Sequence, residues 1–169
     1  SNPCLAFPDH SKPFQLFVDA CVGSKEERGG ICGVLCQTHQ GRTRPIGFFS
    51  RKMRSSENSY NPYNAELLAI LRSLTHFETI IKGTDVTVFS DHKPLVLEDQ
   101  RTSKTMSHLS MKIQEFEAKL RFVKGSDNTF ADFVSRHAAT EDATAGASGG
   151  HHGLNEDWQK SHISKWGLA

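Results

Sequence analysis

The amino-acid sequence predicts an α/β fold in which helices flank a mixed β-sheet. Two strand-like segments separated by a turn come first along the chain, and a later strand follows only after a long helical segment. A hairpin supplies antiparallel pairing and a strand that returns through a helix supplies parallel pairing, so one sheet holds both. The 169 residues suffice for one globular body plus an appendage.

The first three strands are expected over residues 14–22, 29–37 and 43–51. The segments FQLFVDACV and GGICGVLCQ are apolar and are separated by the charged, glycine-containing turn GSKEERGG, which predicts a hairpin. The segment TRPIGFFSR follows the turn THQGR and is expected to form the third strand. A loop that carries buried aromatic residues is the alternative for this third segment.

Residues 61–83 form the longest predicted helix. Apolar residues recur there at three-to-four spacing, Pro62 lies in the first turn and Gly83 ends the pattern. A strand is expected next over 85–91. It is followed by a turn and short helix over 92–100, a helix over 103–117, a half-exposed strand over 118–125 and a compact helix over 128–137.

A change of composition after His137 marks the expected end of the domain. The segment AATEDATAGASGGHHG has too little apolar surface to fold alone, so residues 138–169 are expected to be a linker or tail. Trp158, Ile163 and Trp166 could form one side of a short helix that docks on the domain or on a partner. A disordered linker is the alternative.

Composition excludes a membrane-spanning helical protein, because no apolar run approaches the ~20 residues needed to cross a bilayer. The N-terminal stretch lacks a basic segment leading into an apolar one and so does not resemble a secretory signal. The four cysteines lack CxxC spacing and lie in or beside apolar stretches. Reduced core thiols are therefore expected, with a disulfide or a metal site as alternatives. The net charge of +1 favours no partner by itself.

Four carboxylates do not fit the apolar pattern around them. Asp19 interrupts the first strand, and Asp91 ends the strand over 85–91. Glu66 opens the long helix directly before LLAI, and Asp132 lies between Ala131 and Phe133 in the last predicted helix. A charge is rarely buried without a partner.

Each of these carboxylates has a simple structural explanation if it is taken alone. An acidic residue can stabilise a helix N-terminus, face solvent or pair with an arginine. Taken together, the four predict an acidic cluster whose mutual repulsion a bound cation offsets. Carboxylates select hard ions such as Mg²⁺ or Mn²⁺. Two such ions ~3.5–4 Å apart can flank a phosphodiester, which predicts phosphoryl hydrolysis.

Four segments of the sequence also carry a family resemblance. They are LFVDA (16–20), GFFSRKM leading to YNPYNAELLAI (47–70), SDHKPL (90–95) and GSDNTFADFVSR (125–136). Together, and in this order, they resemble the ribonuclease H domain of gypsy-type LTR retrotransposon polyproteins, which lies downstream of a reverse transcriptase. The lead-in PCLAFPDHSKPF resembles the segment that joins the two.

The resemblance implies a ribonuclease H-like fold, with a five-stranded mixed sheet flanked by helices. It implies an endoribonuclease that hydrolyses the RNA strand of RNA/DNA hybrids with two Mg²⁺ ions, for which Mn²⁺ can substitute. The acidic quartet of the family maps onto the same four carboxylates as catalytic residues and metal ligands. Residues 1–13 then form a connecting segment and residues 14–137 the ribonuclease H domain.

Further residues are candidates for contacts with nucleic acid. Backbone phosphates position a duplex without reading its sequence, whereas RNA is distinguished through its 2′-hydroxyls. The phosphate candidates are Arg51, Lys52 and Lys93, and the 2′-hydroxyl candidates are Ser24, Tyr63 and Asn64. Each could instead be only an exposed, turn or cap residue. The catalytic-loop histidine of many relatives has no counterpart in FVKGSDNTFA, which suggests lower turnover.

The resemblance also implies partners and a location. The partners are an RNA/DNA hybrid and the reverse transcriptase portion of the same polyprotein, besides a possible protein partner for the tail. The location is cytoplasmic, in a virus-like particle, or nuclear if the element has been domesticated. The alternative function is a catalytically weak or inactive scaffold that serves as a tether or a protein-interaction module.

Overall fold

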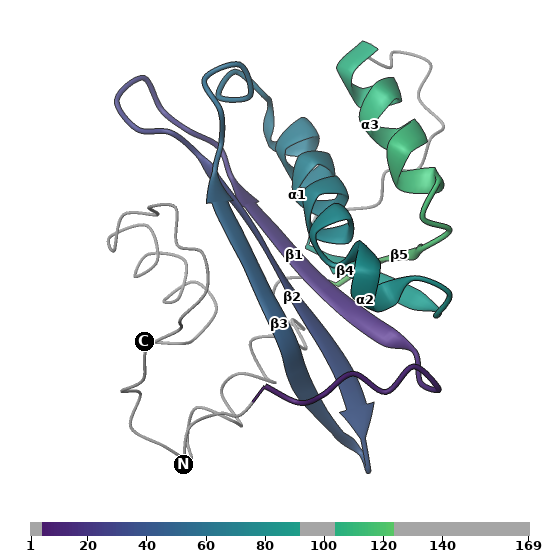
Figure 1. Cartoon of the computed structure of the whole chain (residues 1–169). Helices are drawn as coiled ribbons and strands as arrows, with labels where there is room; N and C mark the ends of the chain where they lie inside the picture. The colour runs from purple at the N-terminus through teal and green to yellow at the C-terminus, as the bar shows by residue number, and fades with distance from the viewer. Residues whose placement is uncertain (1–4, 92–103, 124–169) are drawn as a thin grey trace, which may run out of the picture.

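The computed structural model describes residues 5–91 and 104–123, which form a five-stranded sheet with helices (Figure 1). The strand order across the sheet is β3-β2-β1-β4-β5. The elements are β1 (Phe14–Cys21), β2 (Gly30–His39), β3 (Arg42–Lys52), α1 (Pro62–His76), α2 (Glu78–Ile81), β4 (Val86–Ser90), α3 (Lys104–Gln114) and β5 (Lys119–Phe122).

The sheet is mixed, as the sequence predicts. The chain runs antiparallel from β1 through β2 to β3, and β4 then pairs parallel to β1 and to β5. Gln40 and Gly41 form the two-residue connection between β2 and β3, and both have a positive φ. A two-residue turn of this kind matches the twist of the flanking strands. The third segment is therefore a strand and not a loop.

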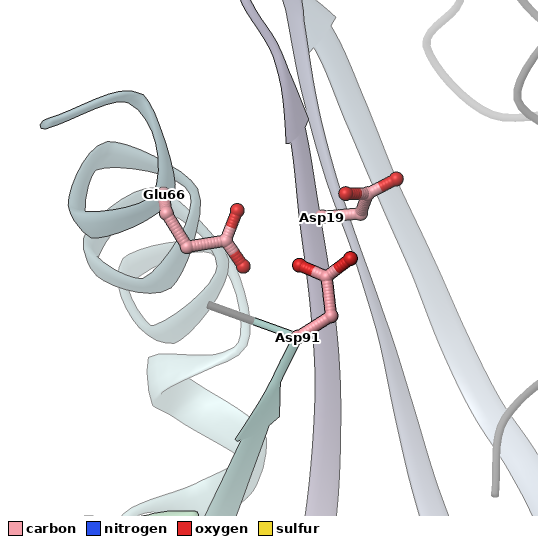
Figure 2. Close-up of side chains that lie close together, drawn as sticks. All are labelled: Asp19, Glu66 and Asp91. Carbon is pink, nitrogen blue, oxygen red and sulfur yellow. The ribbon is translucent and has the colours of Figure 1, made fainter. Parts of the chain in front are cut away.

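Helices α1 and α3 lie on the same side of the sheet (Figure 1), and α1 supplies most of the helical part of the core. Its buried side chains pack with those of Leu16, Ile31 and Leu35 in the sheet. Figure 2 shows the end of the sheet at which β4 stops, with the start of α1 beside it. No helix in the portion that the structure describes is long and apolar enough to span a membrane.

The long predicted helix is two helices and not one. Helix α1 ends at His76 and α2 begins at Glu78, with Phe77 between them. Thr75 Oγ1 donates a hydrogen bond to the Leu71 carbonyl at 2.8 Å, a contact that bends helices because it competes for a backbone acceptor. The predicted stop at Gly83 is confirmed by its φ of +76°.

Strand β5 differs from the predicted half-exposed strand. All four of its residues are exposed, and the apolar Leu120 and Phe122 retain 43% and 39% of their accessible surface. The reason is its position, since β5 is an edge strand of only four residues. The predicted elements over 92–100 and 128–137, the boundary after His137 and the tail lie outside the described residues.

Three of the four cysteines test the prediction of core thiols. Cys32 and Cys36 are buried, and Cys21 is half-buried, each as a thiol and not a disulfide. Burial raises the pKa of the Cys36 thiol to about 12, which keeps it neutral and unreactive. The prediction is confirmed for Cys32 and Cys36, whereas Cys21 is a thiol outside the core, and Cys4 lies outside the described residues.

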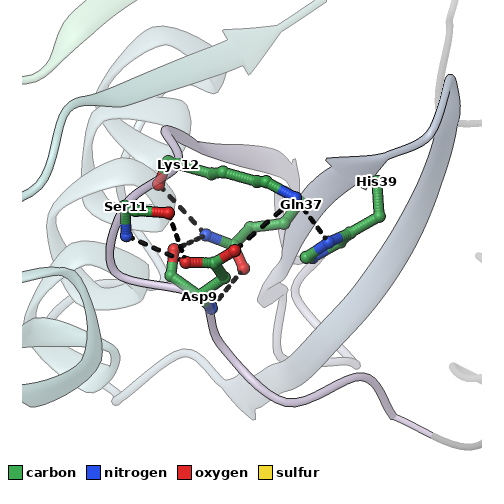
Figure 3. Close-up of polar contacts among 5 residues, drawn as sticks. All are labelled: Asp9, Ser11, Lys12, Gln37 and His39. Atoms are coloured by element: carbon green, nitrogen blue, oxygen red, sulfur yellow. Dashed lines mark hydrogen bonds and ion pairs between the residues drawn. The ribbon is translucent and has the colours of Figure 1, made fainter.

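Residues 5–13 are fastened to the sheet by the buried side chain of Gln37 (Figure 3). Gln37 Oε1 accepts from the Asp9 amide at 2.8 Å, and Gln37 Nε2 donates to the carbonyls of Asp9 and Lys12 at 2.8 and 3.1 Å. The Ala6 amide donates to the Pro45 carbonyl on β3. The segment before β1 is therefore held against strands β2 and β3 by hydrogen bonds.

The turn between β3 and α1 is organised by Glu57, which is only 6% exposed. Its two carboxylate oxygens accept from Arg51 Nη1 and Nη2 at 2.7 and 3.0 Å, and Oε2 also accepts from the Arg54 amide. Burial alone would raise the pKa of Glu57. The hydrogen bonds from Arg51 and the Arg54 amide outweigh burial and hold this pKa below its usual value of 4.5.

Replacing Gln37 should lower stability, because a buried amide that satisfies three backbone groups is lost. We expect Gln37→Ala to lower the free energy of unfolding by about 2–3 kcal/mol, measured by urea denaturation. The matched control is Gln15→Ala on the neighbouring strand. Among the described residues the Gln15 side chain bonds only to exposed Thr38, so this change should cost less than ~1 kcal/mol. Equal losses in both variants would contradict the role of Gln37.

The Glu57 pair predicts a pH dependence of stability. Because the folded-state pKa is lowered, the ionised carboxylate stabilises the fold above about pH 4.5, and this contribution is lost as the pH falls through the folded pKa. Glu57→Gln should therefore lower the free energy of unfolding by about 2 kcal/mol at pH 7 and by much less near pH 3.

Thermal unfolding of the wild type, Glu57→Gln, Arg51→Gln and the double variant across this pH range would measure the effect. The single variants should be non-additive above pH 5, since each removes the same pair. Additive losses would show that the two side chains act separately.

Candidate active site

The parallel pairing of β1 and β4 brings two of the predicted carboxylates side by side. Phe17 and Phe89 are register partners, and their rings stack with centroids 5.0 Å apart. Asp19 and Asp91 each follow two residues later. Because side chains alternate along a strand, Asp19 lies on the same sheet face as Phe17, and its carboxylate has an oxygen within 4.8 Å of one from Asp91. Asp19 is in β1, whereas Asp91 comes directly after the end of β4.

Helix α1 supplies the third carboxylate from the side. Asn61 caps this helix by accepting from the Asn64 amide at 2.8 Å, and Pro62 occupies its first position. Glu66 follows one turn later and is 1% exposed. Its Oε1 accepts a 2.6 Å hydrogen bond from Ser90 Oγ at the end of β4, which fixes the orientation of the buried carboxylate.

Asp19, Glu66 and Asp91 lie close together at the end of β4 (Figure 2). Each residue has a carboxylate oxygen that lies within 4.8 Å of those of the other two. Two oxygens bound to one Mg²⁺ are at most roughly 4.2 Å apart, twice the usual metal–oxygen distance. The three oxygens are gathered close to this spacing, and an all-carboxylate donor set is the kind that a hard divalent cation prefers.

Of the four predicted acidic residues, the structure therefore brings three together. Asp132 lies outside the described residues, as do Lys93 and the neighbouring His92. The assignment of the four carboxylates as catalytic residues and metal ligands stays a prediction, which the placement of Asp19, Glu66 and Asp91 favours.

The candidate contacts for nucleic acid lie on the strands, loop and helix around this cluster. Lys52 is exposed at the end of β3, whereas the guanidinium of Arg51 is already bonded to Glu57. Ser24 is exposed in the loop between β1 and β2. Tyr63 and Asn64 lie in the first turn of α1, less than one turn before Glu66.

Two of these residues have polar atoms in unusual surroundings. Burial raises the pKa of Tyr63 above its usual value of 10, so this phenol, which is protonated at neutral pH in any case, keeps its proton to higher pH. Asn64 is 8% exposed, and its Oδ1 is buried without a hydrogen-bond partner within the described chain. Such an atom carries a desolvation cost that a ligand donor can relieve.

Sequence reasoning missed Ser90 and Asn58. Ser90 directly precedes Asp91 and, by strand alternation, points to the α1 side, so the pattern VFSD held a signal for its contact with Glu66. Asn58 contacts the loop between β1 and β2 through both ends of its amide. This contact spans more than 25 residues of sequence, and no local pattern predicts it.

Comparison of the sequence with protein families identifies residues 9–116 as an RNase H-like domain found in reverse transcriptase. Among curated relatives, the Pol polyprotein of the Drosophila melanogaster transposon opus is 34% identical over 80% of this chain and 13% of its own length. The Pol polyprotein of the transposon gypsy is 33% identical over 78% of this chain and 12% of its length. The chain thus spans only about an eighth of these relatives.

Comparison of structures shows the same fold. An RNase H1 of Halobacterium salinarum superposes with a TM-score of 0.55 at 11% identity, covering 69% of this chain and 89% of that one. The foamy viral protease-reverse transcriptase in complex with an RNA/DNA hybrid gives a TM-score of 0.50 at 13% identity, covering 88% and 19%. The ribonuclease H-like fold predicted from sequence is confirmed, and the chain belongs to the family of RNase H-like domains of reverse transcriptases.

Proposed function

We propose that this domain is an endoribonuclease that hydrolyses the RNA strand of RNA/DNA hybrids. One observation carries the proposal: three carboxylates from β1, α1 and the end of β4 meet within 4.8 Å. A scaffold gains nothing from such a cluster, because like charges at this distance destabilise it. The family membership supplies the reaction class, and the cluster supplies the groups that this reaction requires.

The residues of the site would hold two Mg²⁺ ions, with Mn²⁺ as a substitute. Asp19 and Asp91 would bind on the sheet side and Glu66 on the helix side, with Asp132 as the proposed fourth ligand. Bound ions of this kind supply an activated water and stabilise the leaving oxygen. Ser90 would keep Glu66 oriented through its hydrogen bond, so that the carboxylate meets a ligand without rearrangement.

Substrate contacts are proposed for the residues that surround the cluster. We propose that Tyr63, Asn64 and Ser24 contact 2′-hydroxyls across a shallow minor groove. Lys52 is proposed to contact a backbone phosphate, and Lys93 is proposed for the same role. Arg51 can reach a phosphate only by sharing or leaving its bonds to Glu57. We therefore rank Arg51 below Lys52.

The context of the activity is also a proposal. The relatives are polyproteins, and a structural neighbour is a reverse transcriptase bound to an RNA/DNA hybrid. We infer that the domain acts during reverse transcription beside a polymerase portion, in a cytoplasmic virus-like particle, or in the nucleus if the element is domesticated. Further phosphate contacts from the polymerase would strengthen hybrid binding, because the domain itself has little net charge.

Cleavage should depend on the carboxylates of the cluster. With Mg²⁺ or Mn²⁺ the wild-type chain should cut the RNA strand of a labelled hybrid, and Asp19→Asn or Glu66→Gln should lower the rate at least about a hundredfold. The matched control is Asp85→Asn, because Asp85 is exposed at the opposite end of β4 from Asp91 and should leave the rate unchanged. Gel analysis of the products measures all three.

A folded wild-type chain that leaves hybrids intact with either ion would contradict the proposal and favour the inactive scaffold. Asp132→Asn belongs in the same series. Its loss of activity is expected to match that of Asp19→Asn if Asp132 is the fourth ligand.

Metal binding should also be visible in stability without any substrate. Without metal, Asp19→Asn should raise the free energy of unfolding by about 1 kcal/mol, since it relieves repulsion within the cluster. Saturating Mn²⁺ should stabilise the wild type, by about 2.7 kcal/mol at a hundred times Kd, and should hardly affect the variant. Thermal unfolding by circular dichroism measures both. Equal stabilisation of wild type and variant would place the metal elsewhere.

A further inference from the structure

The loop over residues 22–29 joins β1 to β2 beside the acidic cluster. It leaves β1 at Cys21, two residues after Asp19, and enters β2 at Gly30. Most of its residues are exposed, including the substrate candidate Ser24. The position of this loop therefore decides what a substrate meets next to the proposed metal site.

Asn58, in the turn between β3 and α1, bridges the two limbs of this loop. Its Oδ1 accepts from the Gly29 amide at 3.0 Å, and its Nδ2 donates to the Ser24 carbonyl at 3.3 Å. Within the loop, Ser24 Oγ accepts from the amides of Glu26 and Glu27. The side-chain amide of Asn58 thus links the two limbs of the loop. The hydrogen bonds of Ser24 with Glu26 and Glu27, within the loop, order its tip.

Packing around this bridge leaves no space for a side chain at either glycine of the loop. A Cβ added to Gly23 would lie 2.0 Å from Asn58 Oδ1, and one added to Gly29 would lie 2.9 Å from Met53 Sδ. The Met53 amide also donates to the Gly29 carbonyl at 2.8 Å. Both glycines are therefore required by close approach and not by turn geometry alone.

The bridge is itself held by the end of β3. The backbone amide of Asn58 donates to the Arg54 carbonyl at 3.1 Å. The carboxylate of neighbouring Glu57 accepts hydrogen bonds from the Arg51 side chain and the Arg54 backbone amide. A continuous set of contacts thus runs from β3 through Asn58 to the loop. This chain of contacts does not include Asp19, Glu66 or Asp91.

We propose that Asn58 is a positioning residue. It fixes the position of the 22–29 loop relative to the acidic cluster, and in that position the loop binds an RNA/DNA hybrid. This inference rests on the proposed function and adds a specific residue to it. Because Asn58 acts through the loop and contacts no metal candidate, it governs affinity for the hybrid and leaves metal binding and the chemical step unchanged.

The test compares Asn58→Ala and Asn58→Asp with the control Ser56→Ala, an exposed residue of the same turn. Asn58→Ala should raise KM for a hybrid about tenfold, which corresponds to the net contribution of roughly one hydrogen bond. The value of kcat should stay within about twofold of the wild type. Asn58→Asp keeps the acceptor for Gly29 and should fall between. Mn²⁺ affinity should equal that of the wild type in all three.

Hydrogen exchange supplies a readout that needs no substrate. The Gly29 amide should exchange faster in Asn58→Ala than in the wild type, while core amides of β1 keep their protection. Faster exchange with an unchanged KM would overturn the inference, because the loop position would then not matter to the hybrid. A fall in kcat with weaker Mn²⁺ binding would also overturn it.

Failure of the proposed function has a different signature. In that case the wild-type chain itself neither binds nor cleaves hybrids, and the substrate role of Asn58 fails with it. The exchange of the Gly29 amide then still decides whether Asn58 holds the loop.

Discussion

Electrostatic repulsion among three buried or half-buried carboxylates is the constraint on which this structure depends. Two unit charges 4.8 Å apart repel by about 3.5 kcal/mol at the effective dielectric constant of ~20 typical of proteins. The surrounding fold must impose their proximity, because the carboxylates themselves oppose it. It does so with the most regular parts of the molecule, which are the β1–β4 register and the long helix α1.

The order of elements was predictable because each has a strong local signal. Alternation and β-branched residues identify the strands, and three-to-four spacing identifies α1 and α3. The break at Phe77 was not predictable, because Phe77 continues the apolar spacing of the helix and only its backbone angles, φ −94° and ψ 7°, end α1. The exposure of Leu120 was equally hidden, because alternation along a strand does not tell which neighbours cover its two faces.

The candidate site likewise contains residues that the sequence predicted and residues that it did not. Asp19 and Glu66 were detectable because a charge within an apolar stretch conflicts with its surroundings, and such conflicts concentrate at functional sites. Arg51 illustrates the limit, because composition near a strand end suggested a phosphate contact and the fold gives it a bidentate bond to Glu57. Asn58 and Ser90 act through contacts across the sequence, which require the three-dimensional arrangement before they can be recognised.

The two ends of strand β2 hold different parts of the structure. Near one end, Cys32 pairs with Asp19, and the strand begins at the loop that Asn58 bridges. Near the other end, buried Gln37 fastens the segment that precedes β1. Five residues along a strand separate Cys32 from Gln37 by roughly 17 Å. The segment that precedes β1 is thus held at the end of β2 that lies far from the acidic cluster.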